Sequence, residues 1–360
     1  MADIVDRALD GCALGGFGGQ LAIGSVCKGR IVSTVTKHRL ASQVERSFGA
    51  AQAGDHGVVD VDAPGEKQVG RSDGRGGPFP NSIGHRPGTR HHMADVVHHR
   101  AHVIAGGFPP GSSAGHDHDY ARLRLLTLLA ERQIPASVAN DFADMEKWLP
   151  MSRLLVTYVA GPYPSAEQCT RLKSWLEAGG HWLALHGTSG GRAERVEGLT
   201  QRRTVRTEHH AMLGSMFLTH PPACRFRVDV CDAEHPVTQG LGKSFEVEDE
   251  PYFIELQAPA SAQILLTADY GAMGRWPVVE KLYGTDTSVQ SDGKTRVLGY
   301  TRRVGGGAVT YLALGHCHSP YSRVGRSAGA GNEQPATFRG PWEARAFTTL
   351  LGNAIAWATA

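Results

Sequence analysis

Histidine, acidic and tyrosine side chains gather at several points where an apolar strand pattern ends. The residues that stand out are His116, Asp117, His118, Asp119, His186, His235, Glu250, Tyr252 and His316. Imidazole and carboxylate groups in one pocket suit general acid–base catalysis, because their pKa values can be tuned around neutrality. The same groups are ligands of divalent metal ions. The sequence therefore predicts acid–base or metal-assisted chemistry.

His186 has the most informative position in this set. The apolar run from Trp182 to Leu185 ends at His186, and small residues follow directly. A strand that leaves the core and turns sharply is typical of the carboxyl edge of an open α/β sheet, where such sheets bind ligands. In enzymes with a nucleophile elbow, this turn carries Ser or Cys. Here it carries an imidazole, although a ring that only hydrogen-bonds a neighbouring strand is the alternative.

We predict that His186 and His316 form an acid–base pair or bind a divalent metal ion, the only cofactor that the sequence suggests. Glu250 is expected to orient one imidazole or to serve as a base, and Tyr252 to line the pocket. The remaining candidates are expected to bind substrate: His116, Asp117, His118, Asp119 and His235.

A structural role is the alternative for several of these residues and their neighbours. The aspartates at 117 and 119 can cap a following helix, and the histidine before Pro236 suits a turn. The acidic pair at 249 and 250 can be a solvated pair, and His318 suits either role equally. Cys317 is the one cysteine near the proposed site, and without an elbow context it is not expected to be a nucleophile.

Alternating strand and helix patterns must position these residues. Helices are predicted over Asp119–Gln133 and Pro341–Ala358, and a third helix is predicted to follow the N-cap residue Ser165 and to run to Ala178. The predicted strands are Ala101–Ala105, Ser137–Ala139, Leu154–Val159, Trp182–Leu185, Arg225–Val230, Phe245–Glu250, Gln263–Thr267, Arg296–Tyr300 and Ala308–Leu314. Such alternation predicts an α/β fold with a doubly wound, mostly parallel sheet. Because the carboxyl ends of parallel strands meet at one edge, the histidines after these strands should converge.

Composition excludes several classes of protein. The 360 residues are 41% hydrophobic and carry a formal charge of +2, and the basic residues form no long run, so no nucleic-acid partner is expected. No apolar stretch is long enough to span a bilayer, so no membrane partner is expected. The six cysteines are scattered without a Cys-x-x-Cys pair, and the acidic start lacks a signal-peptide pattern. We therefore expect reduced thiols and a cytoplasmic location.

The composition changes near residue 100. Residues 1–100 are rich in Gly, His, Arg and Asp and lack sustained apolar periodicity, so we expect a disordered or non-native N-terminal extension. Residues 101–360 are expected to form the folded domain. One hypothesis is that the native start is Met93, which leads directly into the first strand.

Taken in order, the chemistry-bearing segments from 101 to 358 resemble the ThuA-like family, named for trehalose utilisation. The segments that carry the resemblance are His116–Asp119, Glu177–Gly180 with Leu185–Gly187, Met212–Phe217 with His220–Pro221, His235–Pro236 with Gly240–Leu241, Asp249–Tyr252, Gly315–His316 and Ala354–Ala358. Two parts depart from it: the basic, Gly-rich loop Thr188–Arg195, and residues 1–100, which match nothing associated with the family.

The resemblance implies a flavodoxin-like fold with class I glutamine amidotransferase-like topology. It also implies sugar metabolism, with a disaccharide or keto-sugar as the small-molecule partner and an isomerase, lyase or hydrolase reaction. A non-catalytic sugar-binding or regulatory module is the alternative. An amidotransferase-type hydrolase is disfavoured, since His186 replaces the elbow nucleophile. Homo-oligomerisation is left open.

Overall fold

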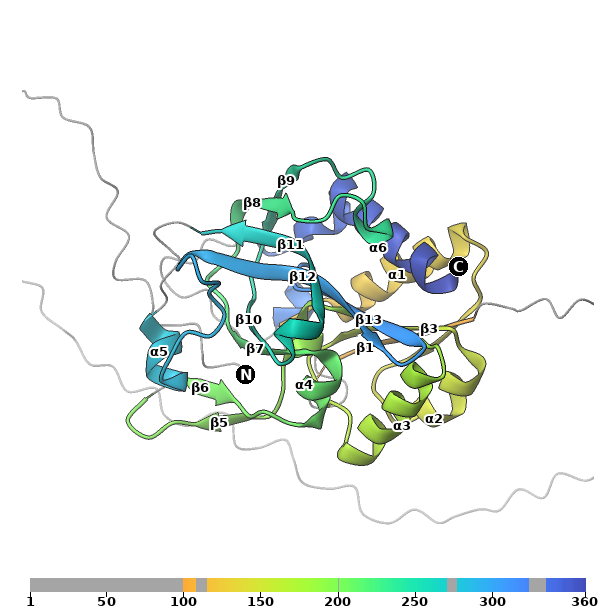
Figure 1. Ribbon diagram of the computed structural model, residues 1–360, viewed down its shortest axis with the longest axis horizontal. Helices are drawn as coiled ribbons and strands as arrows, with labels where there is room; N and C mark the ends of the chain where they lie inside the picture. Colours follow the sequence, from red (N-terminus) through yellow and green to blue (C-terminus); the bar gives the residue numbers. More distant parts are fainter. Residues whose placement is uncertain (1–99, 108–114, 200, 271–276, 324–334) are drawn as a thin grey trace, which may run out of the picture. The chain divides into compact units, whose positions relative to one another are not determined.

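The computed structural model describes residues 100–107, 115–199, 201–270, 277–323 and 335–360 (Figure 1). The predictions for residues 1–99, including the extension and the alternative start at Met93, lie outside the described residues. The architecture of the described part is mixed α/β.

A nine-stranded sheet organises the described residues, in the order β2-β1-β3-β4-β13-β12-β11-β8-β9. Its strands are β1 (Ala101–Gly106), β2 (Ala136–Ala139), β3 (Leu154–Val159), β4 (His181–Leu185), β8 (Cys224–Val230), β9 (Ser244–Asp249), β11 (Ala262–Asp269), β12 (Thr295–Val304) and β13 (Gly307–Leu312). All the strands predicted from the sequence are present, with ends shifted by a few residues. The candidate site residues follow the ends of several of these strands.

The sheet is parallel in one half and antiparallel in the other. Strands β2, β1, β3, β4 and β13 run parallel, which confirms the expectation for this half. Strands β12, β11, β8 and β9 pair antiparallel, so the prediction of a mostly parallel sheet needs correction there. The reason is partly local: Gly305 and Gly306 connect β12 to β13, and a two-residue connection only permits an antiparallel hairpin.

Helices cover both faces of the parallel half (Figure 1). Helices α1 (His118–Glu131) and α6 (Arg345–Thr359) contact each other and β3, whereas α3 (Ala166–Glu177) packs against β12 and β13. Ser165 caps α3 as predicted, and Gln168 completes a capping box. The shorter helices are α2 (Met145–Trp148), α4 (Glu208–Leu213) and α5 (Pro277–Tyr283).

Short elements that the sequence analysis did not predict surround this sheet. Strand β7 (Ser215–Thr219) pairs with β10 (Phe253–Leu256), and β5 (Ala193–Arg195) pairs with β6 (Arg202–Thr204). A 3-10 turn, η2 (His186–Ser189), follows β4 directly. Strand β7 contacts both η2 and β6.

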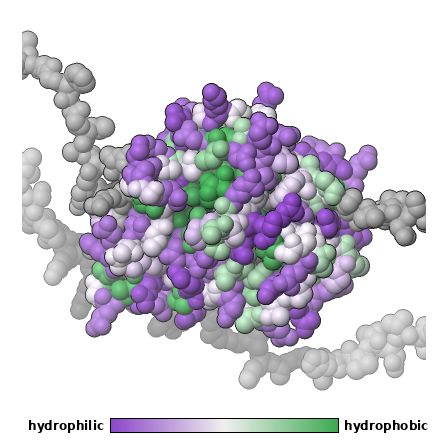
Figure 2. All heavy atoms as spheres, in the orientation of Figure 1, coloured by the Kyte–Doolittle hydropathy of each residue, from purple (hydrophilic) through white to green (hydrophobic). Residues whose placement is uncertain are grey.

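The apolar core lies along the sheet. Strands β1, β3 and β13 are buried over their whole length. The face seen in Figure 2 is mostly hydrophilic, with a group of hydrophobic side chains near its centre. Among the helices that the structure describes, none combines the length and apolarity that a bilayer crossing requires.

The Gly-rich segment after His186 is packed inside the molecule. A Cβ on Gly187 would lie 2.5 Å from the Val159 carbonyl oxygen, so no larger residue fits there without a shift of backbone. His209 Nε2 donates to the Thr188 carbonyl at 2.7 Å. This packing holds the turn that presents His186.

The buried His209 makes the folded protein sensitive to acid. Burial lowers its pKa to about 3, whereas an unfolded chain titrates His near 6.5. Above about pH 6.5 neither state is protonated at this ring. Between those values the unfolded state binds the extra proton, so the free energy of unfolding falls as the pH falls.

We therefore expect His209→Gln, which keeps a donor for Thr188, to flatten this dependence. The slope of unfolding free energy against pH should decrease by up to about 1.4 kcal/mol per pH unit in the acidic window. Urea denaturation of both proteins at a series of pH values measures it. Equal slopes would contradict the assignment.

Candidate metal centre

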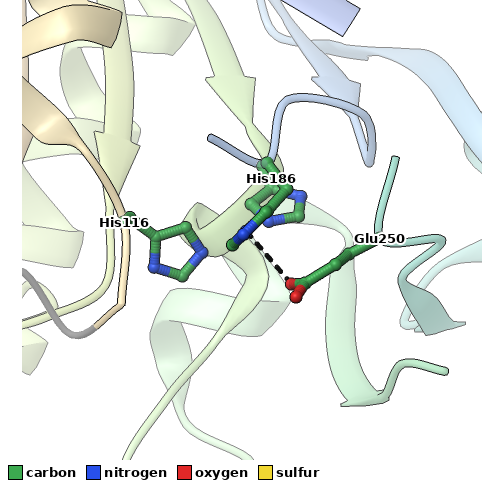
Figure 3. A group of neighbouring side chains, drawn as sticks. His116, His186 and Glu250 are labelled. Carbon is green, nitrogen blue, oxygen red and sulfur yellow. Dashed lines mark ion pairs between the residues drawn. The ribbon is translucent and has the colours of Figure 1, made fainter. Parts of the chain in front are cut away.

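Four side chains from widely separated segments converge at the carboxyl edge of the parallel strands. Nitrogen atoms of His116, His186 and His316 and an oxygen of Glu250 all lie within 4.8 Å of one another, and all four residues are buried. Figure 3 shows the labelled side chains pointing towards a common space, with a dashed line for the close approach of the His316 ring to Glu250. The structure thus brings His116 together with the three residues predicted to be catalytic.

The ring of His186 is held in one orientation. Its backbone has φ = 44°, a left-handed conformation that is rare outside glycine, at the sharp turn between β4 and η2. Its Nδ1 lies 2.8 Å from the Ala313 carbonyl oxygen. A carbonyl only accepts, so Nδ1 carries the proton and Nε2 presents a lone pair. That Nε2 is buried and has no hydrogen-bond partner.

A relay of two hydrogen bonds fixes the tautomer of His316. His318 Nε2 donates to the Pro335 carbonyl at 2.9 Å, which leaves Nδ1 of the neutral ring as an acceptor. His316 Nε2 lies 2.9 Å from that Nδ1 and donates to it. The proton of His316 therefore resides on Nε2, and its Nδ1 presents a lone pair to the centre.

That lone pair faces a second acceptor. His316 Nδ1 lies 3.1 Å from Glu250 Oε2, and it makes no hydrogen bond there. Burial lowers the pKa of His316 well below its usual value, so the ring stays neutral. Two electron-pair donors at this separation repel each other unless a cation lies near both. The geometry is that of ligands around a positive charge.

Asp249 positions the two sides of this pair. Its buried carboxylate accepts the backbone N–H groups of Gly315 at 2.7 Å, Glu250 at 2.8 Å and His316 at 2.9 Å. Burial raises the pKa of Asp249, whereas these three donors act to lower it. The bonds tie the end of β9 to the loop after β13.

Aromatic rings close the centre. The ring of Tyr252 lies 3.8 Å from that of His186, and its hydroxyl lies 3.4 Å from His116 Nε2. Burial raises the pKa of Tyr252 well above its usual value, so the phenol stays protonated. His118 packs beside Tyr158 with its ring 5.5 Å away, and burial lowers the pKa of His118 to about 4.

The other predicted substrate-binding residues lie outside the cluster. Asp117 caps α1 through the Tyr120 N–H and pairs with Arg339 at 2.7 Å. Asp119 is exposed and pairs with Arg122 at 2.6 Å. Both aspartates line a cavity that also includes His116.

His235 lies elsewhere. Its ring packs on Trp357 at 5.0 Å and its Nδ1 accepts the Val237 N–H, a turn contact. It lines a different cavity, which shares no residue with the one beside His116. The structure therefore does not bring His235 to the other candidates, because the segment before Pro236 forms a turn at another part of the sheet.

Two histidines of the site had no role assigned from the sequence. His220 Nδ1 lies 3.7 Å from Glu250 Oε2, and its ring stacks on Tyr252. His318 orients His316 as described above. His318 follows a predicted strand, so its sequence signal was present, but it did not distinguish a functional from a structural histidine. His220 follows β7, a strand that the sequence did not predict.

The cluster fits a transition metal ion. Three imidazoles and one carboxylate suit ions such as Zn²⁺, Fe²⁺ or Ni²⁺. Four ligand atoms about 2.1 Å from a tetrahedral ion lie about 3.4 Å apart, so a bound ion would draw the most widely spaced atoms of this group together by as much as about 1.4 Å. His186 donates its second ring nitrogen to a backbone carbonyl, as metal-ligating histidines do.

Comparison with known proteins identifies the family. The family model described as "ThuA: Trehalose utilisation" matches residues 111–325. The chain belongs to the ThuA family. Among curated proteins, no match is found. The family is therefore established by the sequence model, and it suggests a carbohydrate-related function without naming a reaction.

Solved structures similar to the chain include two ThuA-like proteins. One, from Bacteroides uniformis ATCC 8492, is 16% identical over 75% of this chain and 95% of its own, with a TM-score of 0.47. The other, from Parabacteroides merdae ATCC 43184, is 17% identical over 72% of this chain and 89% of its own, with a TM-score of 0.45. A β-galactosidase from Rahnella sp. R3 is 14% identical over 60% of this chain and 28% of its own, with a TM-score of 0.39.

The full chain is expected to bind about one transition metal ion per molecule, because the lone pairs of the cluster converge. His186→Ala should lose most of this metal. His235→Ala removes a histidine outside the cluster and should retain it. Elemental analysis after dialysis against Zn²⁺ measures both. Equal metal contents in the two variants would contradict the ligand assignment.

His318 is expected to act through His316. His318→Ala should weaken Zn²⁺ binding about 10- to 100-fold, as is usual when the partner of a ligating histidine is lost. His318→Asn offers an oxygen acceptor to His316 Nε2 and should restore much of the affinity. Competition with a chromogenic chelator gives the dissociation constants. If the Asn variant were as weak as the Ala variant, the relay would not be the cause.

Proposed function

We propose that this ThuA family member is a metal-dependent enzyme that acts on a disaccharide or a keto-sugar. His116, His186, Glu250 and His316 would hold a divalent transition metal ion at the carboxyl edge of the sheet. The family description supports the sugar substrate. The observation that carries the metal is the approach of two acceptors, His316 Nδ1 and Glu250 Oε2, to 3.1 Å.

Metal binding is favoured over the alternative of a His186–His316 acid–base pair. Burial lowers the pKa of His186 to about 3 and that of His316 well below its usual value. A general base works best with a pKa near the working pH. Rings this weakly basic serve better as neutral ligands, which offer a lone pair without taking a proton.

The chemistry proposed for a keto-sugar uses the groups around the centre. A bound metal ion would act as a Lewis acid and polarise the substrate carbonyl. The Tyr252 phenol, protonated because it is buried, donates a hydrogen bond to a substrate oxygen. Glu250, or His220 beside it, accepts the proton from the carbon next to the carbonyl. Return of the proton to the former carbonyl carbon, with the hydroxyl proton passing from one oxygen to the other, gives isomerisation. Departure of a leaving group from the next carbon, with its bonding electrons, gives elimination.

Thiol chemistry of the amidotransferase kind is disfavoured. The elbow position holds His186, and Cys317 is fully buried between Tyr158 and the Asp117 carbonyl. Burial raises the pKa of the Cys317 thiol to about 12, whereas a reactive cysteine needs a lowered pKa. Cys317→Ser is therefore expected to keep any activity.

Strand order and cysteine spacing support the proposed fold relationship and cellular location. The parallel strands follow the order β2-β1-β3-β4-β13, which supports a flavodoxin-like relationship and the class I glutamine amidotransferase-like topology. A cytoplasmic location rests on cysteines without a Cys-x-x-Cys pair. A small-molecule sugar is the proposed partner, and no nucleic acid or membrane is proposed.

Turnover of trehalose, maltose and their keto derivatives by Zn²⁺-, Fe²⁺- or Mn²⁺-loaded protein tests the proposal, with products followed by NMR. At least one sugar should be converted, and Glu250→Gln should lower kcat about 100-fold or more, because it loses a ligand and a proton acceptor. His235→Ala serves as the control and should be unaffected. Binding of sugar without turnover in any metal form would instead support a non-catalytic module.

A further inference from the structure

A polar cavity adjoins the metal centre on the side of His116. It has a volume of about 380 Å³, and its wall includes His116, Asp119, Arg122, Asn140 and Tyr321. That volume lies near the lower end for small-molecule sites and suits a single ring rather than a long oligomer. His116 belongs to both the cavity and the cluster, so a ligand in the cavity contacts one residue of the centre.

Tyr321 presents an aromatic face to water at the wall of this cavity. It is 89% exposed, the largest exposed fraction among the big hydrophobic side chains that the structure describes. An exposed aromatic ring is a typical hot spot for binding a ligand with one apolar face. A pyranose has such a face, made by its axial C–H groups. A quaternary ammonium ion would need several rings, and Tyr321 is the only aromatic ring besides the imidazoles among the described lining residues.

The charges in the cavity are already balanced. Arg122 Nη1 donates to Asp119 at 2.6 Å, and its Nη2 donates to the Ala105 carbonyl at 2.5 Å and to Asn140 Oδ1 at 2.6 Å. Asp117 is bound by Arg339 and by a backbone N–H. Arg122 Nε has no hydrogen-bond partner, but it is buried. Among the described lining residues, therefore, no guanidinium nitrogen that a ligand can reach is left without an acceptor, and no lysine is present.

The polar groups of the cavity wall that remain available can hydrogen-bond to the hydroxyl groups of a ligand. Asn140 accepts from Arg122 through its oxygen, so its amide nitrogen is a donor. Asp119 is exposed and bonds Arg122 through one oxygen, so the second oxygen can accept. Donors and acceptors side by side match the hydroxyls of a neutral sugar. A dianionic phosphate would instead meet the Asp117 and Asp119 carboxylates, which repel it.

We propose that the cavity between His116 and Tyr321 is a subsite for one uncharged pyranose ring, which stacks on Tyr321 and bonds to Asp119 and Asn140. The neighbouring ring or carbonyl of the substrate then reaches the centre at His116. The subsite selects unphosphorylated sugars over sugar phosphates. This inference rests on the proposed function for its reaction, but not for its binding step.

Calorimetric titration of the full, metal-loaded chain tests the subsite. The probes are trehalose, maltose and lactose, each neutral, and trehalose 6-phosphate. We expect at least one neutral disaccharide to bind, and trehalose 6-phosphate to bind at least about tenfold more weakly than trehalose. Tighter binding of the phosphate, or no binding of any neutral disaccharide, would overturn the proposal.

Two variants and a matched control assign the binding to Tyr321. Tyr321→Ala should weaken disaccharide binding about tenfold, and Tyr321→Phe should retain it, because the stacking face remains. Leu123→Ala removes another exposed hydrophobic side chain, 62% exposed and outside the cavity, and should bind like the wild type. Unchanged affinity in Tyr321→Ala would overturn the stacking role.

Metal content separates this inference from the proposed function. Tyr321 is not in the cluster, so Tyr321→Ala should hold as much metal as the wild type. If disaccharides bind through Tyr321 but the protein holds no metal and turns nothing over, the subsite stands and the proposed enzyme falls. If metal and turnover are found while Tyr321→Ala binds normally, the subsite falls and the enzyme stands.

Discussion

The site depends on the hydrogen bonds that the buried carboxylate of Asp249 accepts. Its three bonds to the backbone N–H groups of Glu250, Gly315 and His316 join the end of β9 to the loop after β13. They thus connect the antiparallel half of the sheet to the parallel half. Glu250 and His316 are fixed relative to each other without a ligand. Without the carboxylate, each buried N–H left unpaired would cost about 1–3 kcal/mol.

Backbone carbonyls then decide where protons reside. The Ala313 carbonyl accepts a hydrogen bond from Nδ1 of His186. The Pro335 carbonyl accepts one from His318, whose other ring nitrogen accepts one from His316. In His186 and His316, the ring nitrogen that faces away from the cluster therefore carries the proton, and the other nitrogen directs a lone pair into the cluster. The centre therefore has electron-pair donors on several sides, which a cation would bring together. The cavity beyond has the opposite character, because its guanidinium is already bonded, and it suits a neutral ligand.

Much of the fold could be predicted because the relevant signals are local. The apolar run Leu154–Val159 is β3 to the residue, and the Ser165 cap marks the start of α3. Short elements were missed because tertiary contacts stabilise them: the Thr204 N–H in β6, for example, bonds to the Tyr283 hydroxyl. Strand direction in the second half was also missed. An alternating pattern shows which face of a strand is buried, but not which neighbour it pairs with.

The sequence by itself determined which residue types end the strands, where those strands lie, and which family the chain resembles. Only the tertiary structure decided which histidines converge. His116, His186 and His316 meet, whereas His235, equally well marked in the sequence, packs on Trp357. The physical reason is that convergence depends on the order of strands in the sheet and on the acceptor that each ring meets. Both are set by contacts between residues far apart in the chain.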